Sequence, residues 1–190
     1  MARRKLSVSS TRDIYTYVYL YHAANFSMEQ AVASEEGRLY NCMSSIILSA
    51  FCIEAYLNHI GRELLPYWDD DIIKDISPSN KLKIICHHLD LQVDFSHRPF
   101  QAFKSVFKFR NLMAHGKSAT LSEKRIQNVR DGERPKFPEI WWEKQCQLGT
   151  AKQLLTDTES MIVKIHKAAG KSDSPFIVFG FGTYLGAVVK

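Results

Sequence analysis

The chain has 190 residues, of which 45% are hydrophobic and 24% charged, and its formal net charge is +5. This length suits one domain with a sizeable core and is too short for two large ones. The composition excludes a wholly disordered or low-complexity chain. The N-terminal segment has no apolar core and no run reaches about 18 apolar residues, so neither a signal peptide nor a membrane-spanning helix is expected.

The positive charge is concentrated in one region. Residues 98–136 contain ten Lys and Arg residues and three acids, which gives a local charge of +7 and leaves −2 elsewhere. Such a region indicates an anionic partner, of which nucleic acid is the commonest, or alternatively a solvated basic loop. Charge alone favours the loop.

The four cysteines are widely spaced and form no Cys-x-x-Cys pair: Cys42, Cys52, Cys86 and Cys146. Three of them lie in apolar runs with helical spacing. The pattern indicates buried, reduced thiols rather than a disulfide framework or a zinc site, which fits a cytoplasmic protein. The sequence predicts no metal and no cofactor.

Two long helices are predicted near the N-terminus. The first covers residues 13–33, with Asp13 in its first turn. The second covers residues 35–65 and is the strongest helical signal in the chain, because apolar residues recur at intervals of three and four until Pro66 ends the helix. These apolar residues are Leu39, Met43, Ile46, Ile47, Ala50, Ile53, Leu57 and Ile60.

Shorter helices are predicted next. Residues 69–76 form a short helix, and the turn at 77–80 supplies a capping residue for a helix at 81–91. Arg98-Pro99 opens a further helix, because proline is favoured in a first turn. That helix runs to His115.

Gly116 follows this helix and is predicted to be the glycine at its C-terminal cap. Residues 117–138 then form a long basic connection. The last long helix is predicted over residues 139–169.

These elements predict an all-α fold, an antiparallel bundle of about five helices with a short apolar C-terminal tail. The predicted organisation is a basic arm at residues 1–12, the helical bundle at 13–170 and a Gly-rich tail at 171–190. The apolar part of the tail, 176–190, is expected to pack on the bundle, pair as a hairpin or support dimerisation. It is too short to span a bilayer comfortably, and no membrane partner is predicted.

The stretch FKFRNLMAHGKS, residues 107–118, carries the candidate chemistry. In a helix Asn111 and His115 share a face, and Arg110 lies about 100° round from Asn111. The helix dipole favours the charged form of His115. A histidine that moves a proton and an arginine that holds a phosphate indicate a phosphoester site. Spacing alone favours the alternative, in which Arg110 forms an ion pair, Asn111 is a polar group on the helix and His115 caps its end.

Arg110-Asn111, followed after three residues by His115, resembles the Arg-x(4–6)-His motif of the HEPN superfamily, in which a polar residue commonly follows the arginine. The segment SSIILSAFCIEAYLNHI, residues 44–60, is similar to an earlier helix of HEPN domains. The all-α pattern over about residues 13–169 also fits the superfamily. The apolar tail is not part of the resemblance.

The resemblance implies a metal-independent endoribonuclease in which the RNA 2′-OH attacks the adjacent phosphorus. His115 would be the general acid or base, Arg110 would stabilise the transition-state charge, and Asn111 would orient the reacting groups. HEPN proteins of this kind are usually dimers with one composite cleft, and many act as toxins or in defence. A homodimer, a protein antitoxin and a nucleotidyltransferase are therefore the implied partners.

Other HEPN members bind RNA, nucleotide or a protein partner without cleaving RNA, which is the alternative function for this chain. Gly116-Lys117 follow His115, with no Tyr directly after the histidine. The modification of such a Tyr by a nucleotidyltransferase, known in one HEPN subgroup, is therefore not expected.

Further residues are assigned supporting roles. Glu54 lies in an apolar helical run, and because a buried carboxylate needs a partner, we hypothesise that it pairs with Arg110 and orients it. Alternatively, Glu54 lies on an exposed or subunit-facing strip. The candidate RNA-binding cations are Lys108, Lys117, Lys124 and Arg125.

Overall fold

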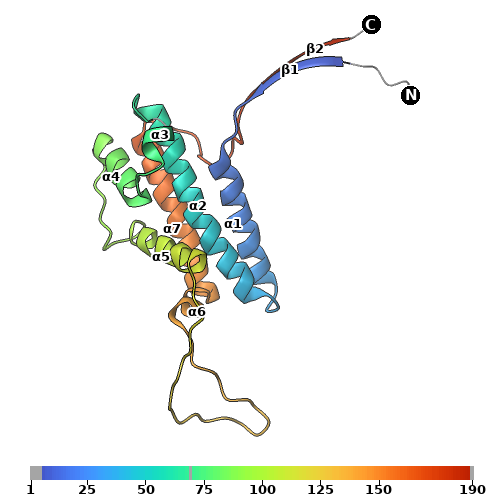
Figure 1. Cartoon of the computed structure of the whole chain (residues 1–190), viewed down its shortest axis with the longest axis vertical. Coiled ribbons are helices and arrows are strands. Elements are labelled where there is room, and N and C mark those ends of the chain that lie inside the picture. Colours follow the sequence, from blue (N-terminus) through green and yellow to red (C-terminus); the bar gives the residue numbers. More distant parts are fainter. Residues whose placement is uncertain (1–5, 69, 189–190) are drawn as a thin grey trace. The chain divides into compact units, whose positions relative to one another are not determined.

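The computed structural model describes residues 6–68 and 70–188. Its elements, in chain order, are β1 (Leu6–Arg12), α1 (Thr16–Ala33), α2 (Arg38–Leu64), α3 (Asp70–Ile73), α4 (Pro78–His88), α5 (Gln101–Ala114), α6 (Trp141–Gln145), α7 (Leu148–Ala168) and β2 (Gly182–Val188) (Figure 1). The protein is mostly helical with a small two-stranded sheet, so the predicted all-α character is confirmed. The described residues form seven helices, two of which, α3 and α6, have only four and five residues.

Local sequence signals explain where α4 begins. Ser77 is its N-cap, and the backbone N–H of Asn80 donates to the Ser77 hydroxyl at 3.3 Å. Pro78 occupies the first helical position, where its missing N–H costs nothing. The predicted capping turn is confirmed, and the helix begins three residues before the predicted 81.

α1 begins later than predicted because the preceding backbone has another partner. The N–H of Asp13 donates to the carbonyl of Phe181 at 2.7 Å, and the N–H of Tyr15 donates to that of Phe179 at 3.0 Å. These bonds hold residues 13–15 in an extended pairing with the C-terminal segment. Asp13 therefore precedes α1 rather than lying in its first turn.

Several other predicted helix ends also differ in the structure. α5 begins at Gln101, so Pro99 precedes the helix instead of lying in its first turn. The helix predicted over 139–169 is divided, because Cys146 closes α6 by donating its N–H to the carbonyl of Glu143 at 3.0 Å before α7 starts. The C-cap of α5 is His115, with φ −118° and ψ 19°, and its N–H donates to the carbonyl of Asn111 at 3.0 Å. Gly116 directly follows this C-cap, at the predicted position, but its φ is not positive, so it does not form a left-handed glycine cap.

The chain divides into two compact units, each built from separate segments. Among the described residues, unit 1 takes residues 6–22, 51–93 except 69, and 162–188, and unit 2 takes 23–50 and 94–161. Helices α1, α2 and α7 contribute residues to both units. The predicted boundaries between arm and bundle at residue 12 and between bundle and tail at residue 170 do not coincide with this division, and they stay predictions.

Unit 1 has an aliphatic core. Full burial of one such side chain contributes about 1.5–3 kcal/mol. The largest fully buried side chains of this unit are Val18, Ile53, Tyr56, Leu57, Ile60, Leu82, Ile85, Ile162 and Ile165. They come from all three long helices and from α4.

β1 and β2 pair as an antiparallel ribbon in which Leu6 faces Val188 and Arg12 faces Gly182. The side chains of β1 are exposed, and no helix covers the ribbon (Figure 1). The tail thus pairs with residues 6–12 rather than with itself. Residues 1–5, which carry most of the charge of the predicted basic arm, lie outside the described residues.

The part of the tail before β2 packs on α1. The ring of Phe176 stacks on Tyr21 with centroids 3.7 Å apart, and the ring nitrogen Nε2 of His22 lies 3.0 Å from the carbonyl oxygen of Phe176. Gly180 has φ +134°, and a Cβ at this position would collide with the backbone of Asp13. This close approach therefore requires glycine.

The core of unit 2 combines aromatic, sulfur-containing and aliphatic side chains. Its buried apolar residues include Met28, Ile46, Phe100, Phe103, Val106, Phe109, Leu154 and Met161. All four cysteines of the chain are buried and free, as predicted. Burial raises the pKa of the Cys146 thiol to about 11, so this thiol is protonated and unreactive at neutral pH.

Among the described residues, one helix is long and apolar enough to cross a membrane, judged by length and composition. This helix is α2, whose most apolar window has a mean hydropathy of 1.2. Half of that window is buried inside the protein. Core helices of soluble proteins meet the same criterion, so α2 is weak evidence for a membrane span.

Gly61 of α2 provides a test of the packing in unit 1. It is buried against the indole of Trp68, and a Cβ would overlap three atoms of that ring. We expect Gly61→Ala to destabilise the protein by about 1–3 kcal/mol, because overpacking outweighs the usual gain of alanine in a helix. Urea denaturation measures this change. The matched control is Gly149→Ala in α7, where the added methyl meets open space and should stabilise by up to about 1 kcal/mol. Equal effects of the two substitutions would contradict this account.

Candidate nucleic-acid interface at the end of α5

An ion pair inside unit 2 holds the start of α5. Asp157 on α7 is only 5% exposed. The Arg98 Nε lies 2.9 Å from both of its carboxylate oxygens, and Nη2 lies 2.8 Å from Oδ1. Gln153 adds a bond of 3.3 Å from its side-chain amide. The buried carboxylate is thereby satisfied, and the chain just before α5 is joined to α7.

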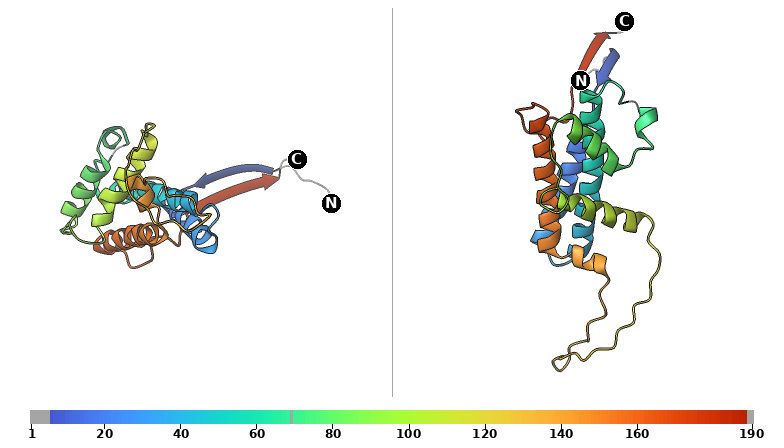
Figure 2. Two further views of the ribbon diagram at one scale, coloured as in Figure 1. Left: turned by 90° about the horizontal axis from the view of Figure 1, so that it is seen from below. Right: turned by 90° about the vertical axis from the view of Figure 1, so that its left-hand side faces the viewer.

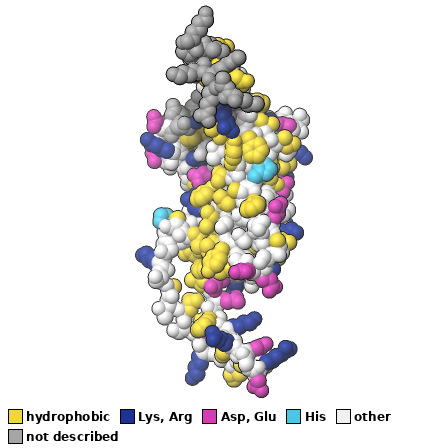
Figure 3. Space-filling view, turned by 90° about the vertical axis from the view of Figure 1, so that its right-hand side faces the viewer, with side chains coloured by type: hydrophobic (Ala, Val, Ile, Leu, Met, Phe, Trp, Pro, Cys, Tyr) yellow, Lys and Arg dark blue, Asp and Glu magenta, His cyan; other side chains and the backbone are white. Residues whose placement is uncertain are grey.

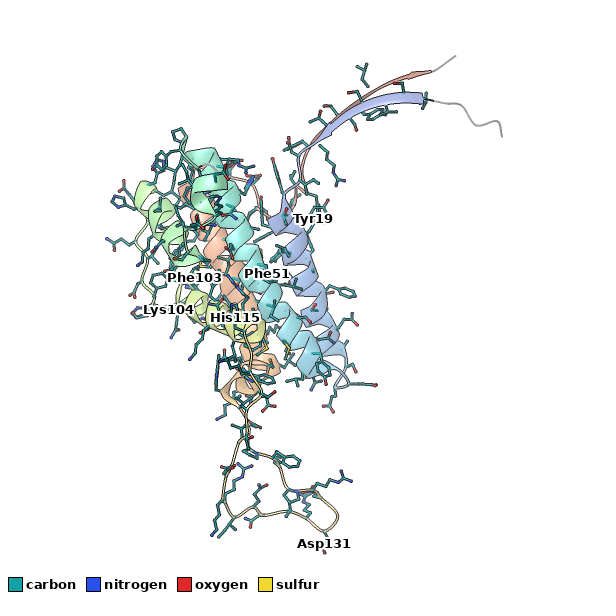
Figure 4. All side chains as sticks on the ribbon, in the orientation of Figure 1. Tyr19, Phe51, Phe103, Lys104, His115 and Asp131 are labelled. Atoms are coloured by element: carbon teal, nitrogen blue, oxygen red, sulfur yellow. The ribbon has the colours of Figure 1, made fainter. Side chains whose placement is uncertain are left out.

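The two faces of α5 differ sharply in character. One face buries phenylalanines, and the rings of Phe103 and Phe107 lie 4.4 Å apart. On the other face, exposed polar residues recur at spacings of four, three and four, which places them along one side of a helix. We call these four residues the polar stripe: Lys104, Lys108, Asn111 and His115. Figure 4 shows Lys104 and His115 near α5 and its end.

Arg110 lies at the border between the two faces. Its side chain is half-buried, and the guanidinium carbon lies 5.2 Å from the centroid of the Phe107 ring. Lys104 is similarly placed 5.1 Å from the ring of Phe95, and Lys108 4.5 Å from the ring of Trp141. Each cation of α5 near the motif therefore lies against an aromatic face, which attracts positive charge without neutralising it.

The predicted RNA-binding cations differ in how their charge is compensated. Within the described part of the chain, Lys108, Lys117 and Lys124 have no carboxylate within ion-pair distance. Arg125, in contrast, pairs with Glu123 at 3.1 Å and donates to the carbonyl of Lys136 at 3.2 Å. Because its charge is already compensated, Arg125 is a weaker candidate for phosphate binding than the three lysines.

Asn111 and His115 are both exposed. The backbone bond between them closes α5, which matches the alternative in which His115 ends the helix. No hydrogen bond joins either side chain to another of the described residues. Asn111 and His115 share a face of the helix end, and the role of Asn111 in orienting reacting groups stays a prediction.

Glu54 is half-buried on α2 and belongs to unit 1, whereas Arg110 belongs to unit 2. The hypothesised ion pair between them stays a prediction. Lys104 was not predicted as a site residue, but it belongs to the polar stripe. The sequence could have indicated it, because Lys104 lies four residues before Lys108, as Asn111 lies four residues before His115.

The basic connection after α5 is a long loop. Residues 116–140 form no helix or strand, and Figure 2 shows the segment leaving and rejoining the helical part of unit 2. The side chain of Gln127 exchanges two hydrogen bonds with the backbone of Lys136, at 2.8 and 2.9 Å. The chain turns at Asp131 (Figure 4) and Gly132, whose φ is +88°.

Basic and acidic side chains both project from this loop into solvent, as Figure 3 shows at the lower end of its view. The loop is therefore a solvated segment, as the charge pattern alone favoured. The polar stripe and the lysines at 117 and 124 nevertheless provide uncompensated positive charge. This arrangement can bind phosphates through its lysines and move a proton through His115.

The Arg98–Asp157 ion pair predicts the stability of unit 2. Removing one partner of a buried pair costs about 3–5 kcal/mol, and because the Arg98 side chain is half exposed, we expect Arg98→Met to cost about 2–3 kcal/mol. The double variant Arg98→Met/Asp157→Leu should cost less than Arg98→Met alone, since it leaves no buried charge behind. Urea denaturation of the two variants and of Asp157→Leu measures this coupling. Additive losses would contradict it.

Comparison of the chain with protein-family models, with curated proteins and with solved structures finds no match in any of the three. The resemblance to the HEPN superfamily therefore stays a prediction. The residues of α5 and the loop, and the chemistry that they can perform, are the basis for inferring a function.

Proposed function

We propose that the chain is a HEPN-like, metal-independent endoribonuclease that acts on RNA through Arg110, Asn111 and His115. The observation that carries the proposal is the polar stripe, which ends in Asn111 and His115 and whose lysines have no carboxylate partners among the described residues. Uncompensated cations beside a histidine are what binding and cleaving a phosphodiester require. We also propose that the fold is an antiparallel bundle of about five main helices, as in the superfamily that the motif resembles.

The proposed reaction needs no metal. The RNA 2′-oxygen forms a bond to the adjacent phosphorus while the bond from phosphorus to the 5′-oxygen breaks. A base takes the proton of the 2′-OH, and an acid gives a proton to the leaving 5′-oxygen. The products are a 2′,3′-cyclic phosphate and a 5′-OH. His115 supplies a proton-transfer group, and Arg110 stabilises the extra negative charge on the phosphoryl oxygens.

A homodimer supplies what one copy lacks. One exposed histidine serves as either acid or base in a given step, whereas two facing copies of His115 serve as both. A second copy would also cover the exposed ring and amide and exclude water, which strengthens the electrostatic contribution of Arg110. The physiological context that fits such an enzyme is a cytoplasmic toxin or defence component with a protein antitoxin or nucleotidyltransferase partner.

The alternative is a non-catalytic module that binds RNA, nucleotide or a protein partner. The observation in its favour is that the Asn111 and His115 side chains have no hydrogen bond to a described residue that would orient them for catalysis. The polar stripe and loop lysines would then serve only to bind phosphates. The two functions predict different outcomes with the same RNA.

The test of cleavage is incubation of RNA with the full chain in EDTA, followed by analysis of the product ends. We expect 2′,3′-cyclic phosphate ends. His115→Ala should lower the rate by about 10²–10⁴-fold and Arg110→Ala by about 10²–10³-fold. His88→Ala, which removes an exposed histidine of α4, is the matched control and should leave the rate unchanged. Cleavage that survives in His115→Ala, or that requires a metal, contradicts the proposal.

The test of binding is the salt dependence of affinity for single-stranded RNA, measured with the His115→Ala variant so that the RNA stays intact. Lys104→Gln/Lys108→Gln should weaken binding and reduce the slope of log affinity against log salt by about 1.4, since each phosphate contact contributes about 0.7 for single strands. Lys74→Gln/Lys83→Gln removes the same charge from exposed positions of unit 1 and is the control. Equal effects of the two double variants would show that binding depends on net charge rather than on α5.

A further inference from the structure

Unit 1 contains a second group of titratable side chains, for which the proposed function has no use. They line a cavity of about 140 Å³. The residues that carry the argument are Tyr17, His59, Glu63, His166, Lys171 and Asp173, which come from α1, α2, α7 and the segment after α7. They lie up to 156 positions apart in the sequence, so no spacing rule groups them.

A hydrogen-bonded chain holds one side of this cavity. The buried ring of His166 has its Nδ1 3.1 Å from the Tyr56 hydroxyl and its Nε2 3.2 Å from Asp173. In the tautomer with the proton on Nε2, Tyr56 donates to the ring and the ring donates to the carboxylate, so all three groups are satisfied. The bond from His166 lowers the pKa of Asp173, which keeps its carboxylate ionised and oriented at the cavity.

An ion pair and two rings hold the other side. Lys171 Nζ lies 2.7 Å from a Glu63 oxygen, and His59 Nε2 lies 3.5 Å from the other oxygen. The His59 ring packs against Tyr15 and Tyr17, with centroid distances of 4.7 and 4.9 Å. Burial lowers the pKa of His59, so its ring is predominantly neutral at pH 7.

Tyr17 supplies the cavity with a donor that a ligand can use. This residue is only 3% exposed and lines the cavity, and its hydroxyl has no hydrogen-bond partner among the described residues. Burial raises its pKa, and the charges of Glu63 and Asp173 raise it further, so the hydroxyl keeps its proton and is a donor. The hydroxyl is thus a donor that lines the open space of the cavity, where an acceptor of a bound ligand can pair with it.

The size and the charges of the cavity restrict the ligand. Common ligand pockets measure about 300–1,000 Å³, so this cavity admits a small ring rather than a whole nucleotide. The carboxylates of Glu63 and Asp173 outnumber the ammonium of Lys171, which disfavours an anion such as phosphate. The Lys171 ammonium and the Tyr17 hydroxyl donor disfavour a simple cation. Among the described residues, no three His, Cys, Asp or Glu side chains converge as metal ligands. The flanking rings favour a neutral planar molecule with both donors and acceptors.

We propose that this cavity binds a guanine base. Guanine presents two adjacent N–H donor groups beside a carbonyl acceptor. The donors match Glu63 and Asp173, whose carboxylates have further lone pairs to offer, and the carbonyl oxygen matches the Tyr17 hydroxyl and Lys171. The face of the base stacks on Tyr15. This site is independent of RNA cleavage, because its residues all belong to unit 1 whereas Arg110 and His115 belong to unit 2.

The test is calorimetric titration of guanosine into the full chain, with adenosine, cytidine and inorganic phosphate as comparisons. We expect saturable binding of guanosine and at least tenfold weaker binding of the other three. Tyr17→Phe removes one oxygen and should weaken guanosine binding by about 2- to 10-fold. Glu63→Gln should weaken it and reduce the preference for guanosine over adenosine. The exposed residue Tyr40 provides the matched control, Tyr40→Phe, which should bind as the parent chain does.

Two further variants keep the outcomes distinct. Lys171→Gln alters a partly exposed position and should also weaken guanosine binding, which covers the case in which Tyr17→Phe does not fold. His115→Ala should bind guanosine normally, so that failure of the proposed cleavage and failure of this site are separate results. Absence of saturable guanosine binding, tighter binding of phosphate, or unchanged binding in folded Tyr17→Phe would each overturn the proposal and leave a water-filled cavity.

Discussion

The carboxylate of Asp157 is the constraint on which unit 2 depends. A charge buried on α7 is tolerable only if a partner reaches it, and Arg98 does so with a bidentate contact immediately before α5 begins. Once this end is held, the length of α5 determines where Asn111 and His115 lie. The phenylalanines of the buried face fix the rotation of the helix, so the polar stripe faces solvent. The position of the candidate site is thus a consequence of an interaction at the opposite end of its helix.

The cations of α5 show how a protein keeps charge available. A lysine paired with a carboxylate, such as Lys171 with Glu63, has much of its charge already compensated. A lysine held over a ring is positioned but stays uncompensated, as Lys104 and Lys108 are. The two units therefore differ in how their lysines are compensated. In unit 1 Lys171 is paired with a carboxylate, whereas in unit 2 Lys104 and Lys108 lie against rings and stay exposed.

The sequence predicts the helices well because their signals are local. The apolar intervals of α2 and the Ser77-Pro78 start of α4 need no information from elsewhere in the chain. The division between α6 and α7 was missed, since the turn at Cys146 has no Gly or Pro to announce it. Pairing of β1 with β2 was also missed, because it joins segments at opposite ends of the sequence.

The candidate site shows the same contrast. The motif residues and most of the polar stripe follow from spacing within one helix. The ion pair of Arg125 with Glu123, and the rings beneath the lysines, depend on how a loop and distant elements fold back. The hydrogen-bonded chain from Tyr56 through His166 to Asp173 spans more than one hundred positions, so only the folded chain brings it together.

The ribbon of β1 and β2 has a mechanical consequence. Residues 6 and 188 are paired at its open end, so a force applied to these two residues acts on the ribbon as on a zipper. The cross-strand hydrogen bonds would then break one pair at a time, at low force, instead of all together. Because the ribbon contributes no side chains from β1 to a core, the helices would not bear load until it had opened. Stretching of the chain would thus begin with a weak, reversible step that leaves both helical units folded.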